Sequence, residues 1–164
     1  MTVMSVQKDP EALTMTFVAQ FDATAERLWR VLEDPRQLER WWGPPGWPAT
    51  FDLHEFKVGG DSRYYMTAPD GNKARGWWKF TAIEAPERLE FDSGFAGDNG
   101  EPLDVEDAMH MVITIEPAGD RTQMTVLTRF ASLAQMERNV SMHFADGMRM
   151  ALGQIDDLLA GAAP

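Results

Sequence analysis

The sequence predicts an α+β fold in which a curved antiparallel sheet of six to seven strands grips a long C-terminal helix. Short stretches that alternate apolar and polar residues, as strands with one buried face do, occur near the N-terminus and six times between residues 47 and 131. A helical apolar stripe then runs from about Leu133 to Leu159 without a proline. Because a strongly curved sheet does not pack flush against a straight helix, we expect an apolar cavity between them.

The N-terminal part predicts one strand followed by two short helices. Every odd-numbered residue in 13–21 is apolar, which is the pattern of a strand. Thr24 is then a suitable N-cap for a first helix. Asp34 and Pro35 begin a second helix, since aspartate caps well and proline is tolerated at the first helical position. We expect this helix to reach residue 42 and to end at the Gly-Pro-Pro-Gly of residues 43–46.

Six further strands are expected before the long helix. They are Ala49–Phe56, Ser62–Thr67, Lys73–Ile83, Leu89–Ser93, Met109–Glu116 and Gln123–Phe130. Turns rich in Gly, Pro, Asn and Asp separate them, which favours an antiparallel meander. Gly94–Asp107 has little periodicity and is expected to be a long mobile loop. Residues 1–10 and 161–164 are expected to fray, which leaves an ordered core of about residues 12–160 in a single domain of residues 1–164.

The composition indicates an acidic cytoplasmic protein. Fifteen Lys and Arg against 26 Asp and Glu give a formal net charge of −11, which disfavours binding to nucleic acid or anionic membranes. We expect no membrane insertion and no signal peptide, because no apolar run approaches the ~18 residues of a spanning helix and residues 8–11 are polar. The absence of cysteine excludes disulfides. A monomer or a homodimer is expected, the latter through aromatic residues near Trp41–Trp47.

A series of short motifs follows a fixed order along residues 12–160. It comprises Phe21-Asp22-Ala23, Trp29, Asp34-Pro35, Leu38, Trp41-Trp42-Gly43-Pro44, Val58-Gly59-Gly60, Met66, Pro69-Asp70-Gly71, Gly76, Pro86-Glu87-Arg88-Leu89, Thr122 to Val126, and Gly147 through Leu152 to Leu159. The series resembles the heat-shock protein 90 ATPase activator homologue family of the START-like, helix-grip (SRPBCC) superfamily. The resemblance implies a helix-grip fold with a pocket. Related branches include polyketide cyclases and aromatases, lipid carriers and plant hormone receptors.

The chain departs from this family pattern at three positions. Thr24 stands where members often have proline, Ser62 where they often have a large aromatic residue, and Met148 where they often have tryptophan. We expect Ser62 and Met148 to face the interior, so that the cavity is reshaped rather than filled. The family name comes from eukaryotic co-chaperones with an additional domain. Since we expect this chain to lack that domain, a small ligand is favoured over a chaperone partner.

Strand alternation and the helical stripe predict the residues that line the cavity. The content of six Trp, nine Phe and eleven Met suits an adaptable apolar pocket. The predicted lining is Trp41, Trp42, Tyr64, Met66, Trp78, Phe80, Met109, Met111, Ile113, Met124, Phe144, Met148 and Leu152. Each residue alone is also explained as ordinary core, but the set taken together favours a pocket.

Three polar residues are candidates for orienting a ligand: Arg63, Glu106 and His110. Asp107 and His110 are three residues apart and therefore on opposite faces of a strand, so they do not form a dyad. The three histidines lack the spacing of metal ligands, and a structural zinc site is not expected without cysteine. Neither a glycine-rich phosphate loop nor a GxSxG elbow occurs. We expect no metal, no cofactor and no catalytic nucleophile.

These observations favour a non-catalytic protein that binds a small hydrophobic or amphipathic ligand in its internal cavity. An enzyme of the polyketide cyclase or aromatase kind is one alternative, and it requires Tyr64, Arg63 or His110 to project into the cavity within reach of one another. A protein-interaction module, including a chaperone partner, is the other. It requires a filled interior and an exposed apolar patch that includes Trp47 or Trp77.

Overall fold

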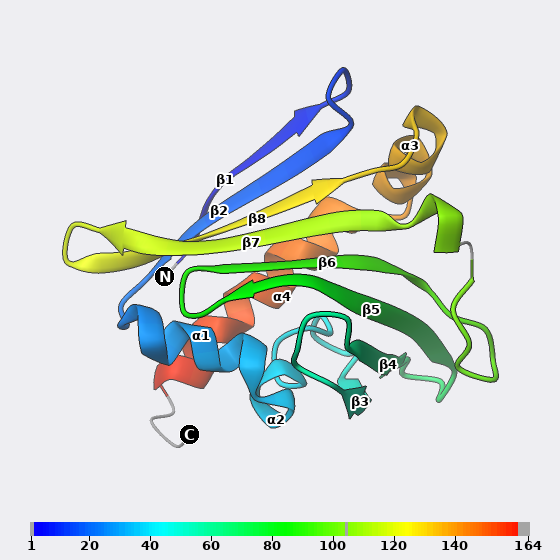
Figure 1. The fold of residues 1–164 in the computed structure, drawn as a ribbon, viewed down its shortest axis with the longest axis horizontal. Coiled ribbons are helices and arrows are strands. Elements are labelled where there is room, and N and C mark those ends of the chain that lie inside the picture. Colours follow the sequence, from blue (N-terminus) through cyan, green and yellow to red (C-terminus); the bar gives the residue numbers. More distant parts are fainter. Residues whose placement is uncertain (1, 104, 161–164) are drawn as a thin grey trace.

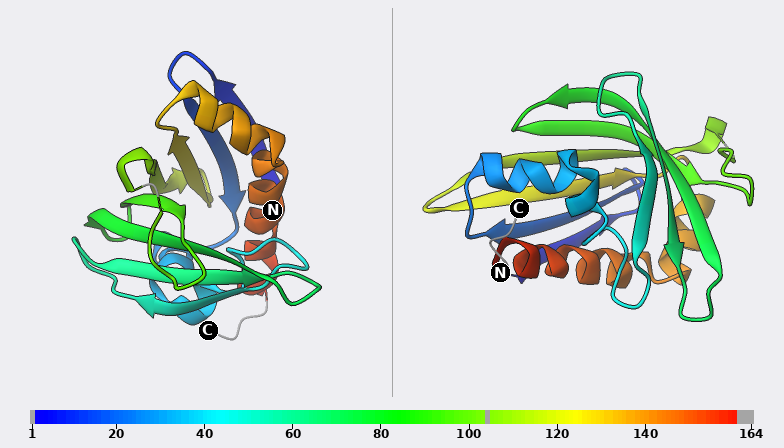
Figure 2. Two further views of the ribbon diagram at one scale, coloured as in Figure 1. Left: turned by 90° about the vertical axis from the view of Figure 1, so that its right-hand side faces the viewer. Right: turned by 90° about the horizontal axis from the view of Figure 1, so that it is seen from below.

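In the computed structural model, which describes residues 2–103 and 105–160, eight strands form one antiparallel sheet in the order β1-β2-β8-β7-β6-β5-β4-β3 (Figure 1). The strands are β1 (Thr2–Asp9), β2 (Thr14–Phe21), β3 (Ala49–His54), β4 (Asp61–Thr67), β5 (Lys73–Glu84), β6 (Arg88–Phe95), β7 (Met109–Ala118) and β8 (Arg121–Arg129). The sheet curves around the last helix, α4 (Phe144–Ala160), as Figure 2 shows. The predicted fold class is therefore confirmed, and the seven predicted strands are present with ends that differ by at most two residues.

The eighth strand, β1, was not expected, because residues 1–10 were predicted to fray. It pairs antiparallel with β2, where Val6 lies opposite Phe17. A shift of register between Val3 and Ser5 interrupts the alternation of apolar residues, which explains why the pattern does not indicate a strand. The described order thus begins ten residues before the predicted core. The predicted frayed end, residues 161–164, lies outside the described residues.

The two short helices are capped as predicted. Thr24 precedes α1 (Ala25–Glu33) and accepts a hydrogen bond from the backbone N–H of Arg27 at 3.1 Å. Asp34 precedes α2 (Pro35–Leu38) and accepts one from the backbone N–H of Arg36 at 2.9 Å. Helix α2 ends four residues earlier than expected, and the chain turns there so that the indole of Trp41 donates to the backbone carbonyl of Val31 at 2.8 Å.

The long C-terminal helix is broken in two. Helix α3 (Leu133–Ser141) begins at the N-cap Ser132 and ends at Met142, and α4 begins two residues later at Phe144. His143 lies between them in the left-handed region, at φ 62°, which ends a right-handed helix. The predicted continuous helix over residues 133–159 is therefore wrong at this point. The break lets α3 turn away from the axis of α4 (Figure 1).

The segment between β6 and β7 is more ordered than the predicted loop. Strand β6 extends to Phe95, a bridge joins Ala96 to Pro102, and Val105–Asp107 forms a single 3-10 turn, η1. The backbone N–H of Leu103 also donates to the carbonyl of Phe95 at 2.9 Å. This segment therefore folds back on itself beside the end of the sheet that faces α3.

Candidate functional site

A cavity of about 230 Å³ lies between the inner face of the sheet and the break between α3 and α4. Strands β4, β6 and β7 supply one wall, the turn after α2 supplies a second, and the two helices supply the third. Its lining residues are Trp42, Pro44, Tyr64, Met66, Ser93, Phe95, Met109, Met111, Asn139, Met142, His143, Phe144, Gly147, Met148 and Ala151. The C-terminal half of α4 instead packs tightly into the core through Ile155 and Leu158.

Aromatic rings form the end of the cavity at which Trp42 lies. The ring of Trp42 meets that of Trp78 edge-on, with centroids 4.8 Å apart, and Trp78 in turn stacks on Phe91 at 4.1 Å. Trp78 is fully buried beneath this contact. The contact between Trp42 and Trp78 therefore makes this end wall of the cavity rigid and apolar. The wall on the opposite side is lined by methionine side chains, which can adapt to a ligand.

Tyr64 brings a hydroxyl group into this apolar end. Its ring lies over Gly76, the residue opposite it on β5, and a Cβ atom at that position would overlap the phenol. Burial raises the pKa of Tyr64 above 10.0, although the neighbouring indoles of Trp42 and Trp78 work against the shift. In the described residues, neither indole N–H has a hydrogen-bond partner of good geometry. Tyr64 is therefore a neutral donor and acceptor at the end wall.

The cavity lining carries no Asp, Glu, Lys or Arg among the described residues. Its polar side chains besides Tyr64 are Ser93, Asn139 and the exposed His143 at the break between the helices. Ser93 and Asn139 are each only 3% exposed. The site thus offers neutral hydrogen-bonding groups in an apolar chamber, and no fixed charge with which to pair a buried ion.

Seven of the predicted lining residues do line the cavity. They are Trp42, Tyr64, Met66, Met109, Met111, Phe144 and Met148. The other six lie in the surrounding core rather than at the cavity surface: Trp41, Trp78, Phe80, Ile113, Met124 and Leu152. All six are buried. Four of them lie on strands, Trp41 lies after α2 and Leu152 lies on α4, and the cavity occupies only one end of the core that they form.

The structure does not place the three predicted polar residues in the cavity. Arg63 lies on β4 and His110 on β7, and the residues on either side of each point inward. Because side chains alternate along a strand, those of Arg63 and His110 point to the outer face of the sheet. Arg63 donates to the backbone carbonyl of Gly100 at 3.1 Å. Glu106 is exposed in η1. Their predicted contact with a cavity ligand is therefore corrected by the geometry of the sheet.

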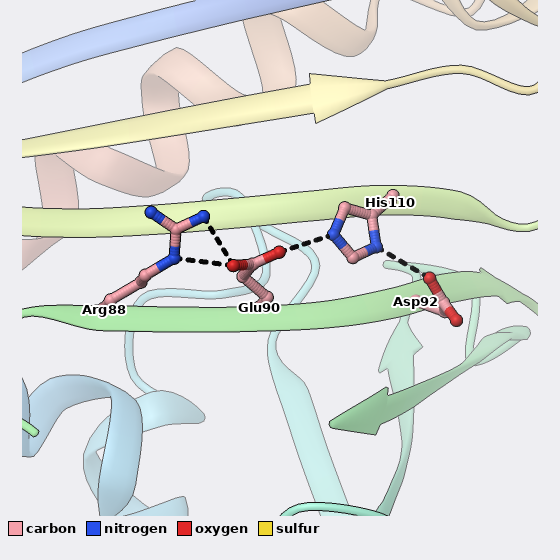
Figure 3. Close-up of polar contacts among 4 residues, drawn as sticks. All are labelled: Arg88, Glu90, Asp92 and His110. Carbon is pink, nitrogen blue, oxygen red and sulfur yellow. Dashed lines mark hydrogen bonds and ion pairs between the residues drawn. The ribbon is translucent and has the colours of Figure 1, made fainter. Parts of the chain in front are cut away.

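His110 instead belongs to a polar network on the outer face (Figure 3). Its Nδ1 lies 2.8 Å from Asp92 and its Nε2 lies 2.9 Å from Glu90, which also accepts from the Nε of Arg88 at 2.6 Å. Burial lowers the pKa of His110, but the two carboxylates raise it by more, so that the net shift is upward. The network joins β6 to β7 and lies on the other side of the sheet from the cavity.

A second histidine pairs with a serine inside the fold. His54 Nε2 donates to the backbone carbonyl of Glu33 at 3.1 Å, which leaves Nδ1 to accept from the Ser62 hydroxyl at 2.7 Å. Ser62 is fully buried, as predicted from its place in the family pattern. The two hydrogen bonds link β4 and β3 to the end of α1.

Sequence reasoning missed the residues at the break between the helices. Asn139 of α3, Met142 and His143 of the break, and Gly147 of α4 all line the cavity. No proline or glycine marks residues 142–143, so the sequence carries no ordinary signal for the break. Ser93 was the last residue of a predicted strand, and its alternation with the buried Leu89 and Phe91 does indicate an inward side chain.

Among the described residues, no group of three or more His, Asp or Glu side chains is arranged to hold a metal ion. The helices of this same part of the chain are too short or too polar to cross a membrane. What the geometry does contain is an apolar chamber between a curved sheet and a terminal helix.

The family model described as activator of Hsp90 ATPase homolog 1-like protein matches residues 22–160. The chain belongs to this family. The resemblance based on the motif series is thus confirmed, and the cavity between sheet and terminal helix lies within the part of the chain that the family model covers.

Solved structures resemble this chain over nearly its whole length. A protein from Arthrobacter aurescens is 56% identical, with a TM-score of 0.92 over 98% of this chain and 93% of that one. A protein from Mycobacterium smegmatis is 37% identical, with a TM-score of 0.88 over 96% of each chain. A protein of the dynemicin biosynthetic locus is 17% identical, with a TM-score of 0.67 over 93% of this chain and 49% of that one, and shares the fold alone. No curated protein matches the sequence.

Proposed function

We propose that this protein binds a small, uncharged, apolar or amphipathic molecule in the cavity between the sheet and α4. The observation that carries the proposal is the chemistry of the wall: Trp, Tyr, Phe and Met side chains surround the space, and the polar side chains inside it, Tyr64, Ser93 and Asn139, carry no charge. An ionised ligand group would lie there without a partner, which is costly in an apolar environment. A cytoplasmic location, and a monomer or homodimer, stay predictions.

The two alternative functions find less support in the geometry. A cyclase of the kind considered above requires several polar groups that converge in the cavity, and of Tyr64, Arg63 and His110 only Tyr64 lines it. A docking module requires an exposed tryptophan patch, but Trp77 is 4% exposed. Trp47 is 40% exposed and remains available for such a contact. Ligand binding is therefore the function that we put to experiment.

Two glycines of α4 provide a matched pair of variants for the test. Gly147 lines the cavity, and a Cβ atom added there would meet nothing within 4 Å. Gly153 has equally open space in the same helix but does not line the cavity. Leucine at either position replaces a helix-weakening residue, so both variants are expected to fold at least as stably as the parent. Only Gly147→Leu places new side-chain volume in the chamber.

The first experiment is titration with the uncharged probe N-phenyl-1-naphthylamine, followed by its fluorescence. We expect binding by the parent protein, an affinity at least about tenfold weaker for Gly147→Leu, and an affinity within about twofold for Gly153→Leu. Native mass spectrometry of the freshly purified protein, with identification of any released molecule, supplies the ligand class. No binding of the probe by the parent, or equal loss in both variants, would overturn the proposal.

A further inference from the structure

A second chamber of about 190 Å³ adjoins the cavity at the end nearest α3. It is lined by Ser93, Gly94, Phe95, Leu103, Asp107, Met109, Gln135, Arg138 and Asn139. Four of these residues also line the first cavity: Ser93, Phe95, Met109 and Asn139. The two spaces therefore meet at a shared boundary made of two apolar and two polar side chains. We call the first space the apolar chamber and the second the polar chamber.

We propose that the ligand spans both chambers, with an apolar body in the first and an uncharged polar head, carrying both a hydrogen-bond donor and an acceptor, in the second. This inference rests on the proposed function and specifies the chemistry of the molecule bound there. Three observations carry it: free hydrogen-bonding groups at the boundary, balanced charges in the polar chamber, and the size of the two spaces.

The boundary holds buried polar groups that the protein leaves free. The side chains of Ser93 and Asn139 both belong to residues that are only 3% exposed. Asn139 donates through Nδ2 to the backbone carbonyl of Gln135 at 2.9 Å. Among the described residues, neither the Asn139 Oδ1 nor the Ser93 hydroxyl makes a hydrogen bond to the protein, and neither belongs to the fully enclosed unpaired atoms, so both groups are open to the cavity. A ligand that displaces water from these groups loses affinity unless it replaces the hydrogen bonds, so the two groups favour a ligand with a donor and an acceptor at the boundary.

The polar chamber contains charges of both signs. Arg138 lies on α3 and Asp107 on η1, and both residues are exposed. Gln135 connects the two elements, since its Nε2 donates to the backbone carbonyl of Asp107 while its Oε1 accepts from the backbone N–H of Ala131. An ionised head would be attracted by one of the two charged side chains and repelled by the other. The two charges offset each other, so the polar chamber has no net charge that selects an ion of either sign, whereas both side chains can hydrogen-bond to a neutral head with a donor and an acceptor.

The sizes of the two chambers support a ligand that spans them. The apolar chamber, at about 230 Å³, is smaller than the roughly 300–1,000 Å³ of ordinary ligand pockets, whereas both chambers together fall within that range. The side chains of Phe95 and Met109 lie at the boundary, and Phe95 is 52% exposed. An elongated molecule therefore fits the combined space better than a compact one does.

The test compares three ligands that share a ten-carbon chain and differ in the head: decanamide, decanoate and decylammonium. Each is tested for displacement of N-phenyl-1-naphthylamine from the protein at pH 7. We expect decanamide to bind about tenfold more tightly than either ion, because only its head offers both a donor and an acceptor to the boundary without bringing a charge into an apolar site. In Asn139→Leu, the affinity for decanamide relative to that for either ion falls about five- to tenfold, as expected for one lost hydrogen bond. Ser93→Ala gives the same direction and serves as the second variant.

The outcomes separate this inference from the proposed function. If the probe binds but the three ligands compete equally, and neither Asn139→Leu nor Ser93→Ala alters their order, the head-group inference is overturned and the apolar cavity stands. Tighter binding of decanoate or decylammonium overturns it as well. If neither the probe nor any ligand binds the parent protein, the proposed function fails. Circular dichroism confirms that each variant is folded before titration.

Discussion

At the scale of single residues, His110 and its two carboxylates make the stability of the sheet depend on pH. The hydrogen bond from His110 lowers the pKa of Glu90, burial opposes this shift, and Arg88 adds to it. Glu90 therefore stabilises the fold above its unfolded pKa of 4.5 and loses this contribution as the pH falls through its folded pKa. The pKa of His110 is raised above its unfolded value of 6.5. His110 therefore stabilises the fold fully below pH 6.5 and loses this contribution to stability as the pH rises through its folded pKa.

Replacement of His110 by glutamine tests this network. We expect His110→Gln to lower the free energy of unfolding by about 0.5–1 kcal/mol between pH 5 and 6, the size of a partly exposed ion pair, and by less at pH 9. Urea denaturation of the parent and the variant at both pH values gives the difference, in which the titration of groups that do not contact His110 cancels. A cost that is the same at both pH values would contradict an ionic role for His110.

The buried pair of His54 and Ser62 has the opposite dependence on pH. Burial lowers the pKa of His54 below 6.5, although the hydrogen bond to Glu33 works against this shift. The unfolded chain therefore takes up the proton first, and stability is lost as the pH falls from 6.5 through the folded pKa. Ser62→Ala removes the donor to Nδ1 and is expected to cost about 1 kcal/mol in urea denaturation at pH 7.5.

A surface serine provides the comparison for this substitution. Ser141→Ala removes a hydroxyl that bonds only to a backbone carbonyl within its own helix, that of Arg138, and should change the free energy of unfolding by less than about 0.5 kcal/mol. If both alanine variants cost the same, the hydrogen bond between Ser62 and His54 contributes nothing measurable to the fold.

At the scale of elements, the break between α3 and α4 determines where the cavity lies. His143 adopts a φ of 62°, a conformation that costs an L-residue about 1 kcal/mol and that glycine adopts freely. We expect His143→Gly to raise the free energy of unfolding by about 0.5–1 kcal/mol, measured in urea. His143→Ala, which keeps the Cβ atom, is the matched control and should bring no such gain. A loss of stability in His143→Gly would indicate that the two helices exchange with a continuous one.

This break also marks the limit of prediction from the sequence. Strand alternation is a short-range pattern, and it placed seven strands within two residues of their observed ends. It also supplied Tyr64, Met66, Met109 and Met111 to the cavity wall. The position of His143 depends instead on how α3 and α4 each meet the curved sheet, which is a long-range effect. The pairing of His110 with Asp92 and Glu90 depends on the register of β6 against β7. It therefore could not be predicted from the sequence either.

At the scale of the whole molecule, α4 has two different roles along its length. Its C-terminal half, with Ile155 and Leu158, completes the core, and Gln154 secures it by donating to the carbonyl of Gly43 at 2.7 Å. Its N-terminal half, from Phe144 to Ala151, forms one wall of the apolar chamber. The C-terminal half of α4 therefore joins the sheet and α1 in the core, whereas its N-terminal half borders the chamber, where the lining can change with less effect on the packing.

Met148→Trp tests this division between stability and binding. Met148 is 7% exposed, faces the apolar chamber and can be replaced by a larger ring that occupies part of that space. We expect the ligand-free variant to melt at the same or a higher temperature than the parent, because filling a cavity restores lost packing contacts. N-phenyl-1-naphthylamine at a hundred times its dissociation constant stabilises the parent by about 2.7 kcal/mol, and this gain should disappear in Met148→Trp. If the variant still gains stability from the probe, the probe binds elsewhere. If the variant melts at a lower temperature than the parent without the probe, the space around Met148 is already fully packed.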